Sequence, residues 1–270
     1  MSRRIALAGR TGTSRIARAI AAGAIALAGT LVVEDAHAIE FGTPAQAHPF
    51  QSAQNFALEI RLSPYYPAVD DEPGLQGTPF KDRFGDSPRL SLGLEFDWQT
   101  FRIPHVGTLG PGVGVHLVGM SRPAVTRDTQ RPSGDEYGLD IYPMYLAGVL
   151  RADVLWRDLG LPVVPYGKLG LGMGLWRASN SGGTSKSALP SETAPVSGKG
   201  VTFGTHMALG VAFALDAIDG GASRNMDNYL GINNTYLYAE YYMLNLNGLG
   251  QDKALHVGTT SWAAGLAFEF

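Results

Sequence analysis

The sequence predicts an all-β protein, an eight-stranded antiparallel transmembrane β-barrel. Three observations lead to this prediction. Eight stretches of the chain alternate between large apolar residues and small or charged residues, which is the period of a strand with two unlike faces. Charged residues make up only 17% of the chain, below the roughly 25% of a soluble domain. The chain contains no cysteine, so backbone pairing and packing must hold it together without disulfides.

Residues 1–38 have the three parts of a cleaved secretory signal peptide. Five arginines come first, an apolar run follows from Ala19 to Val33, and Ala36–Ala38 form an A-x-A cleavage site. The apolar run is too short and too rich in Ala and Gly for a good transmembrane helix. An uncleaved anchor is the alternative reading.

Export changes the charge balance of the chain. Without the leader, 16 basic and 22 acidic residues remain. Nucleic-acid binding requires clustered positive charge, so we expect no nucleic-acid partner. Residues 39–54 are rich in Pro, Gln and Ala without periodicity, which predicts a periplasmic lead-in, and residues 55–270 form the predicted barrel.

The eight predicted strands follow one another along the exported chain. Leu90 to Trp98 alternates most clearly, whereas the register of the fourth strand stays open, because Met144 and Leu146 compete with Tyr145 and Ala147 for the apolar face. The predicted ranges are Phe56–Leu62, Leu90–Trp98, Val113–Val118, Leu139–Leu150, Tyr166–Leu175, Val201–Phe213, Asn234–Leu244 and Leu255–Phe270.

Four long loops and three turns are predicted between these strands. A short periplasmic helix is possible near Ala217 to Met226. An even number of strands puts both termini on one side, and export makes that side the periplasm. The predicted surface loops are Tyr65–Pro88, Arg122–Gly138, Arg177–Gly198 and Asn245–Ala254, and the periplasmic turns are Phe101–Gly110, Ala152–Pro162 and Leu215–Leu230.

Alternation alone does not say which face of a strand looks outward, so a soluble lipocalin-like barrel is the alternative fold. Its outer face would need many Lys, Glu, Asn and Thr. Here the second faces are mostly Gly, Ala and Ser, and small residues suit the crowded interior of an eight-stranded barrel. Strands of about 9 to 12 residues also suit a tilted crossing of a bilayer. The sequence therefore favours the transmembrane barrel.

The last strand ends on aromatic residues at the last and third-last positions, Phe270 and Phe268. With Gly265 upstream, this ending resembles the C-terminal signature of bacterial outer-membrane β-barrels. The resemblance implies that Gly265, Phe268 and Phe270 form an assembly signal. It also implies outer-membrane lipid and the barrel-assembly machinery as partners.

Two further segments extend the resemblance over the exported chain. They are Tyr65-Tyr66-Pro67 followed by Asp70, and the run PYGKLGL that begins at Pro165. Together with the ending, they resemble a family of exported barrels that is broadly similar to OmpA- and OmpW-type eight-stranded proteins. The resemblance implies an outer-membrane location and brings no functional residues with it.

The predicted inward faces collect eight ionisable residues: Glu59, Arg61, Glu95, Asp97, His116, Lys168, His206 and Glu240. A buried charge needs a partner, so we expect Arg61 and Lys168 to meet the carboxylates in a network that plugs the lumen. His116 and His206 would offset the remaining negative charge if protonated. A proton or ion path, or a catalytic pair built on a histidine, is the alternative.

These features predict a structural or surface-interaction barrel with a charge-plugged lumen. A narrow transporter or binder of small hydrophobic molecules is the second reading, and an envelope enzyme is the third. Neither histidine lies in a recognised serine motif, so we expect no enzymatic activity and no cofactor. The acidic residues of the first loop lack the spacing of a calcium loop, so no metal site is expected.

Overall fold

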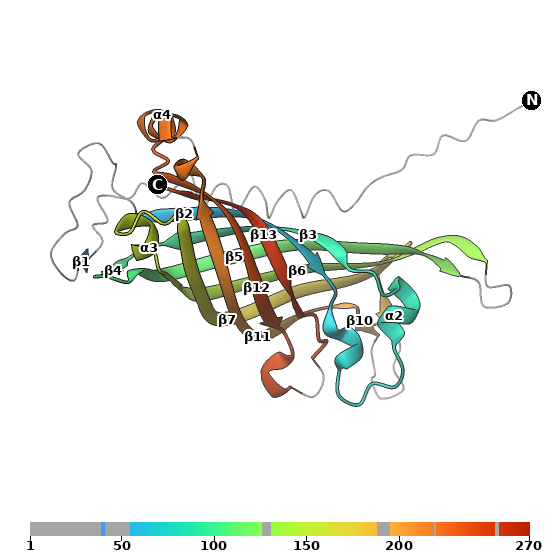
Figure 1. Ribbon diagram of the computed structural model, residues 1–270. Coiled ribbons are helices and arrows are strands. Elements are labelled where there is room, and N and C mark those ends of the chain that lie inside the picture. Colours follow the sequence, from blue (N-terminus) through green and yellow to red (C-terminus); the bar gives the residue numbers. More distant parts are fainter. Residues whose placement is uncertain (1–38, 41–54, 126–130, 188–194, 219, 252–253) are drawn as a thin grey trace, which may run out of the picture. The chain divides into compact units, whose positions relative to one another are not determined.

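The computed structural model describes residues 39–40, 55–125, 131–187, 195–218, 220–251 and 254–270. Eight long strands form a closed antiparallel barrel (Figure 1), which confirms the predicted fold. The barrel strands are β2 Phe56–Tyr65, β3 Arg89–Trp98, β5 Gly107–Val125, β6 Pro132–Arg151, β7 Val163–Asn180, β11 Lys199–Ala214, β12 Asn234–Asn245 and β13 Thr259–Glu269. The predicted signal peptide and residues 41–54 of the lead-in lie outside the described residues.

Each barrel strand pairs with the next, and β13 pairs with β2 to close the ring. Backbone hydrogen bonds from Phe56 N to Phe270 O, 2.8 Å, and from Phe270 N to Phe56 O, 3.0 Å, join the two ends of the barrel chain. We call this end of the barrel the terminus end and the opposite end the loop end.

Short elements occupy the connections. The predicted helix near Ala217–Met226 is present as α4, shifted a few residues along the chain. The remaining elements are β1 Ile39–Glu40, η1 Ala68–Asp71, α2 Pro79–Phe84, β4 Phe101–Ile103, α3 Val154–Arg157, β8 Gly183–Thr184, β9 Lys186–Ser187, β10 Val196–Ser197, η2 Leu215–Ala217, α4 Gly220–Leu230 and η3 Gly248–Gly250. Within the described part of the chain, no helix has the length and apolarity needed to span a membrane.

Four of the predicted connections were wrong in extent. The Arg122–Gly138 loop is largely strand, because β5 continues to Val125 and β6 begins at Pro132. Pro123 is tolerated there because β3 pairs only with residues 112–117 of β5, which leaves Pro123 at a sheet edge.

Similarly, β7 runs to Asn180 into a predicted loop, and the turn Phe101–Gly110 contains β4 paired with the start of β5. The last strand begins at Thr259 and not at Leu255. Alternation marks a strand only where its two faces meet different surroundings, so it missed the strand ends that extend beyond the apolar part of the wall.

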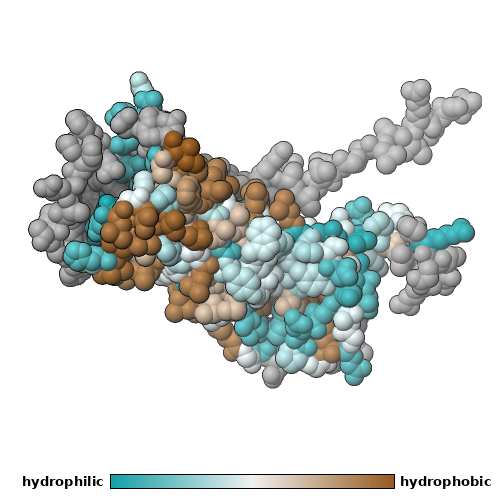
Figure 2. Space-filling model, viewed as in Figure 1, coloured by the Kyte–Doolittle hydropathy of each residue, from teal (hydrophilic) through white to brown (hydrophobic). Residues whose placement is uncertain are grey.

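The outer face of the wall is apolar along most strands. The structure settles the register of β6, since Leu146 is exposed whereas Tyr145 and Ala147 are buried. Hydrophobic residues gather over the half of the barrel that carries the C-terminus, and the loop end is mostly hydrophilic (Figure 2). The exposed large apolar residues of the barrel strands include Ile60, Leu62, Leu92, Val113, Leu146, Leu150, Leu169, Leu171, Val201, Phe203, Leu209, Val211, Leu237, Tyr241 and Trp262.

Candidate functional site: the lumen

All eight ionisable residues predicted to face inward are buried in the barrel. They come from six of the strands, so their side chains reach toward one another across the lumen. The eight are Glu59, Arg61, Glu95, Asp97, His116, Lys168, His206 and Glu240.

Arg61 on β2 lies at the centre of this group. Its Nη1 donates to Glu59 Oε2 at 2.8 Å and to Glu95 Oε2 at 2.6 Å. Its Nη2 donates to Glu240 Oε1 on β12. Arg61 therefore links three strands through three carboxylates, and none of the four side chains meets solvent.

Lys168 on β7 binds the same three carboxylates from the opposite wall. Its Nζ lies 2.9 Å from Glu59, 2.7 Å from Glu95 and 3.1 Å from Glu240. Two cations thus share one carboxylate cluster. Burying such a cluster is tolerable only when each charge has partners, because a lone ion in a low dielectric is costly.

Arg151 is a member of this group that the sequence analysis missed. Its Nη2 donates to Glu59 Oε1 and to Asp97 Oδ2, both at 2.5 Å. The sequence placed the end of the fourth strand at Leu150, one residue short, and left its register open. Arg151 raises the buried cations of this lumenal ion network to three against the four carboxylates Glu59, Glu95, Asp97 and Glu240.

Tyrosines support the lumenal ion network from β6 and β7. Tyr145 donates to Glu95 Oε2 at 2.5 Å, and Tyr166 donates to Glu240 Oε2 at 3.1 Å. Glycines face both rings on neighbouring strands. A Cβ at Gly114 would overlap the Tyr145 ring and one at Gly210 would overlap the Tyr166 ring. The inward-facing glycines have no side chain and thus leave room for the aromatic rings of the neighbouring strands.

The two histidines form a layer with tyrosines on the loop-end side of the ions. The His206 ring stacks on Tyr145 with centroids 3.8 Å apart, and neither of its ring nitrogens has a hydrogen-bond partner among the described residues. His116 Nδ1 lies 3.1 Å from Ser91 Oγ. The sequence analysis found no serine beside either histidine, because Ser91 approaches from another strand.

An apolar plug fills the lumen toward the loop end. Phe80 and Phe84 of α2 are buried and stack on each other with centroids 5.2 Å apart. Asp70 fixes this short helix, since its carboxylate accepts from Phe80 N at 2.7 Å and from Lys81 N at 2.9 Å. The buried members of the plug include Tyr65, Phe80, Phe84, Met120, Leu139, Ile141, Leu244, Leu246 and Val257.

A second polar group closes the interior at the terminus end. Glu269 accepts from Gln99 Nε2 at 2.8 Å, from Asn234 Nδ2 at 3.2 Å and from the Tyr236 hydroxyl at 2.8 Å. The sequence analysis left Glu269 out of the lumenal set, although it alternates with the outward Phe268 and Phe270. The interior is therefore layered along the barrel axis.

The carboxylates Glu59, Glu95 and Asp97 lie close enough together for one ligand atom from each to surround an ion. The charges around them argue against a metal. Arg61, Lys168 and Arg151 already contact the group, and a divalent cation would be repelled by all three. The chemistry of this group fits structural ion pairing better than metal ligation.

The predicted assembly residues lie on the last strand. Phe270 packs beside Phe56 and Phe96, with centroids 6.1 Å and 6.5 Å away, and Phe268 pairs with Leu58 of β2. The packing of the barrel alone explains a glycine at position 265, since a Cβ there would overlap the backbone carbonyl oxygen of Ile60. The seam between the first and last strands needs a residue without a side chain at this position.

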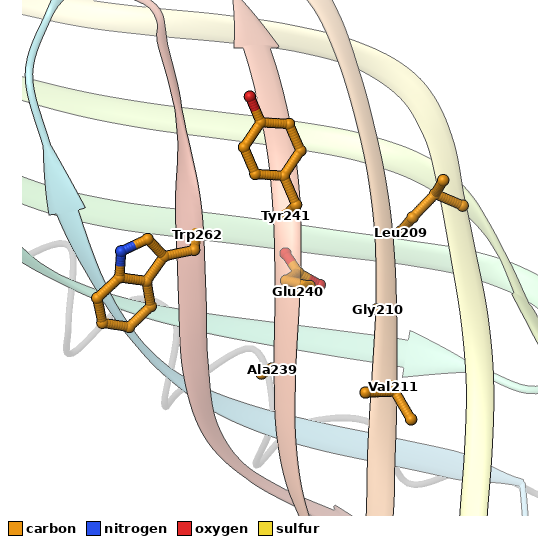
Figure 3. Close-up of a pocket in the computed structure, with 7 residues that line it drawn as sticks. All are labelled: Leu209, Gly210, Val211, Ala239, Glu240, Tyr241 and Trp262. Atoms are coloured by element: carbon orange, nitrogen blue, oxygen red, sulfur yellow. The ribbon is translucent and has the colours of Figure 1, made fainter.

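A shallow hollow lies on the outer wall over β11, β12 and β13 (Figure 3). The small side chain of Ala239 forms its floor, between Leu209 and Val211 on one side and Tyr241 and Trp262 on the other. The hollow is open and mostly apolar, and Gly210 and Glu240 complete its lining.

No protein-family model matches the chain, and no curated protein matches it. Solved structures with a similar fold include Ail of Yersinia pestis, which is 14% identical, with 80% of this chain and 97% of that chain covered and a TM-score of 0.38. Neisserial surface protein A is 12% identical, with 81% of this chain and 98% of that chain covered and a TM-score of 0.42. OprG of Pseudomonas aeruginosa is 12% identical, with 82% of this chain and 97% of that chain covered and a TM-score of 0.40.

Proposed function

We propose that this chain is an outer-membrane β-barrel protein with a structural or surface-interaction role and a closed lumen. The buried ion network carries this proposal. Three cations and four carboxylates fill the middle of an eight-stranded barrel, whose interior has room only for side chains. The apolar plug blocks the same path nearer the loop end.

The outer wall supports the membrane location. Large apolar side chains such as Leu169 and Leu171 are 68% and 65% exposed, and a continuous apolar surface of this kind is the signature of contact with lipid. The even strand number and the leader place both termini in the periplasm in this proposal. Outer-membrane lipid is then the partner of the wall, and the assembly machinery reads the last strand through Phe268 and Phe270.

Conductance through planar bilayers tests the closed lumen. The wild-type protein should give no steady ion current. Lys168→Met removes a cation that three carboxylates share, so the variant should lose stability or admit water and conduct. Lys199→Met, an exposed lysine at the start of β11, is the matched control and should change neither property. A Lys168→Met protein that is neutral in both measurements would mean that the lumen is already wet.

A narrow transporter or binder of small hydrophobic molecules is the second candidate. The apolar composition of the loop-end half of the lumen favours it, because a small hydrophobic molecule that displaced the plug side chains would contact Leu244, Leu246 and Val257. A wet lumen in the conductance experiment would put this candidate first.

We propose no enzymatic activity. Ser91 and His116 make the hydrogen-bonded pair that a nucleophile and its base require. Both side chains are buried between the ions and the apolar plug, so they lack the access to substrate that catalysis needs. Their hydrogen bond satisfies two polar groups in the packed interior.

A further inference from the structure

We infer that α4 is a membrane-surface helix, which lies on the lipid leaflet at the terminus end with Tyr229 and Leu230 inserted among the lipids. The inference rests on the proposed membrane location of the barrel. It adds a second contact with lipid, made by a connection and not by the barrel wall.

The pattern of α4 predicts an amphipathic helix. Met226, Tyr229 and Leu230 are spaced by three and four residues, so they share one face of the helix. Asn228 lies on the other side and is exposed. Gly231, with φ of +68°, ends the helix and turns the chain back toward β12.

Two of the three residues on the apolar face of α4 are uncovered, whereas Met226 is half-buried. Tyr229 is 84% exposed and Leu230 is 69% exposed, and no described residue packs over them in either core cluster. An amphipathic helix of a soluble domain turns this face to its core. Figure 1 shows α4 at the end of the barrel that carries the C-terminus, outside the outline of the strands.

The exposed face continues the apolar surface of the wall. Phe213 and Leu237 are paired outward residues at the terminus ends of β11 and β12, and both are exposed. Ile218, in the connection between β11 and α4, is 73% exposed. Asp216, between Phe213 and Ile218, is half-buried, and its carboxylate accepts from Thr235 N at 3.2 Å. The exposed apolar side chains of this connection thus extend the apolar wall of the proposed membrane barrel toward α4, which selects lipid as the occupant. Aromatic side chains such as Tyr229 favour the boundary between headgroups and acyl chains.

The absence of cysteine from the chain allows a clean test with single spin labels. Tyr229→Cys reports on the apolar face of α4 and Asn228→Cys on its polar face. Leu169→Cys reports on the barrel wall. Each labelled full-length protein is folded into phosphatidylethanolamine and phosphatidylglycerol vesicles, and collisions of the label with oxygen, which enters lipid, are compared with collisions with a water-soluble nickel chelate.

We expect oxygen to dominate at positions 229 and 169 and the nickel chelate to dominate at position 228. If position 169 reports lipid while position 229 reports water, the inference about α4 is wrong and the membrane barrel stands. If position 169 itself reports water, the membrane location fails. A label at position 229 that is shielded from both reagents, in vesicles and in detergent alike, would mean that protein covers this face, which also overturns the inference.

Discussion

Ile60 and Leu62 on β2 are 39% and 45% exposed, whereas Glu59 and Arg61, each one residue away, have no exposed surface. The two faces of one strand therefore place different requirements on their side chains. In the proposed membrane barrel, an outward position needs only an apolar side chain, because lipid accepts any such shape. An inward position needs a particular partner, because the charges of the lumen are satisfied only by one another. Substitutions should therefore be tolerated on the outward face, whereas on the inward face the cost of one substitution should depend on the partners that remain.

Arg61→Met should have the largest effect, because it leaves Glu59, Glu95 and Glu240 with one fewer cation. Breaking a buried ion pair from one side costs roughly 3 to 5 kcal/mol. Urea unfolding of the folded barrel in vesicles measures this cost. Leu62→Met, on the outer face of the same strand, is the control and should cost under about 1.5 kcal/mol.

The double variant Arg61→Met with Glu240→Gln sharpens this comparison, because it removes a carboxylate along with its cation. It should recover part of the lost stability, as coupled residues do. If Arg61→Met costs no more than Leu62→Met, the inner face is as permissive as the outer face and the distinction fails.

Leu94→Arg should lower the stability of the barrel, because in the proposed membrane barrel it puts a charge on the outer face at the depth of the lipid hydrocarbon. An arginine there costs about 2 to 4 kcal/mol at mid-bilayer and about 0 to 1 near the interfaces. Leu90→Arg, on the same strand but at the rim of the wall where the residue is most exposed, should therefore be much milder. Equal and small costs at both positions in urea unfolding would indicate that water, and not lipid, surrounds the wall.

The sequence predicted the faces of the strands well because period-2 alternation reports two different surroundings. The same reasoning brought Arg61 and Lys168 to the carboxylates of the lumen. It missed Arg151, because the predicted fourth strand stopped one residue short at Leu150. It also left Glu269 out of the lumenal set, although the predicted last strand included this residue on its inward face.

The apolar plug could not be predicted in this way. Phe80 and Phe84 lie in a connection that reads as a polar loop with four prolines. Their burial depends on contacts that the local pattern does not show, among them those of α2 with β5 and of Phe80 with Tyr66. The strand ends of β5, β6 and β7 were missed for a related reason. Beyond the apolar part of the wall the outer face carries small and polar residues, such as Ser121, Gly134 and Glu136, so the alternation that marks a strand disappears.

Substitution of Asp153 should have the smallest effect on stability among these predictions, and this carboxylate contrasts most clearly with the lumenal ions. It lies in the connection between β6 and β7, outside the strands of the barrel. Its Oδ2 accepts from Arg102 at 3.2 Å and from Arg157 at 3.4 Å, but its Oδ1 has no described partner. Burial raises the pKa of Asp153 to about 6, although Arg102 opposes the shift.

The folded protein therefore holds the Asp153 proton more tightly than the unfolded chain, whose pKa is near 3.8. The stability that this proton contributes is complete below about pH 4 and is lost as the pH rises through about 6, with a limit of about 3 kcal/mol. Asp153→Asn removes the linkage, so the urea midpoint of the variant should change less than that of the wild type between pH 4 and pH 7. Asp158→Asn, in the same connection and 34% exposed, is the control. An unchanged pH profile in Asp153→Asn would mean that the two arginines outweigh burial at this position.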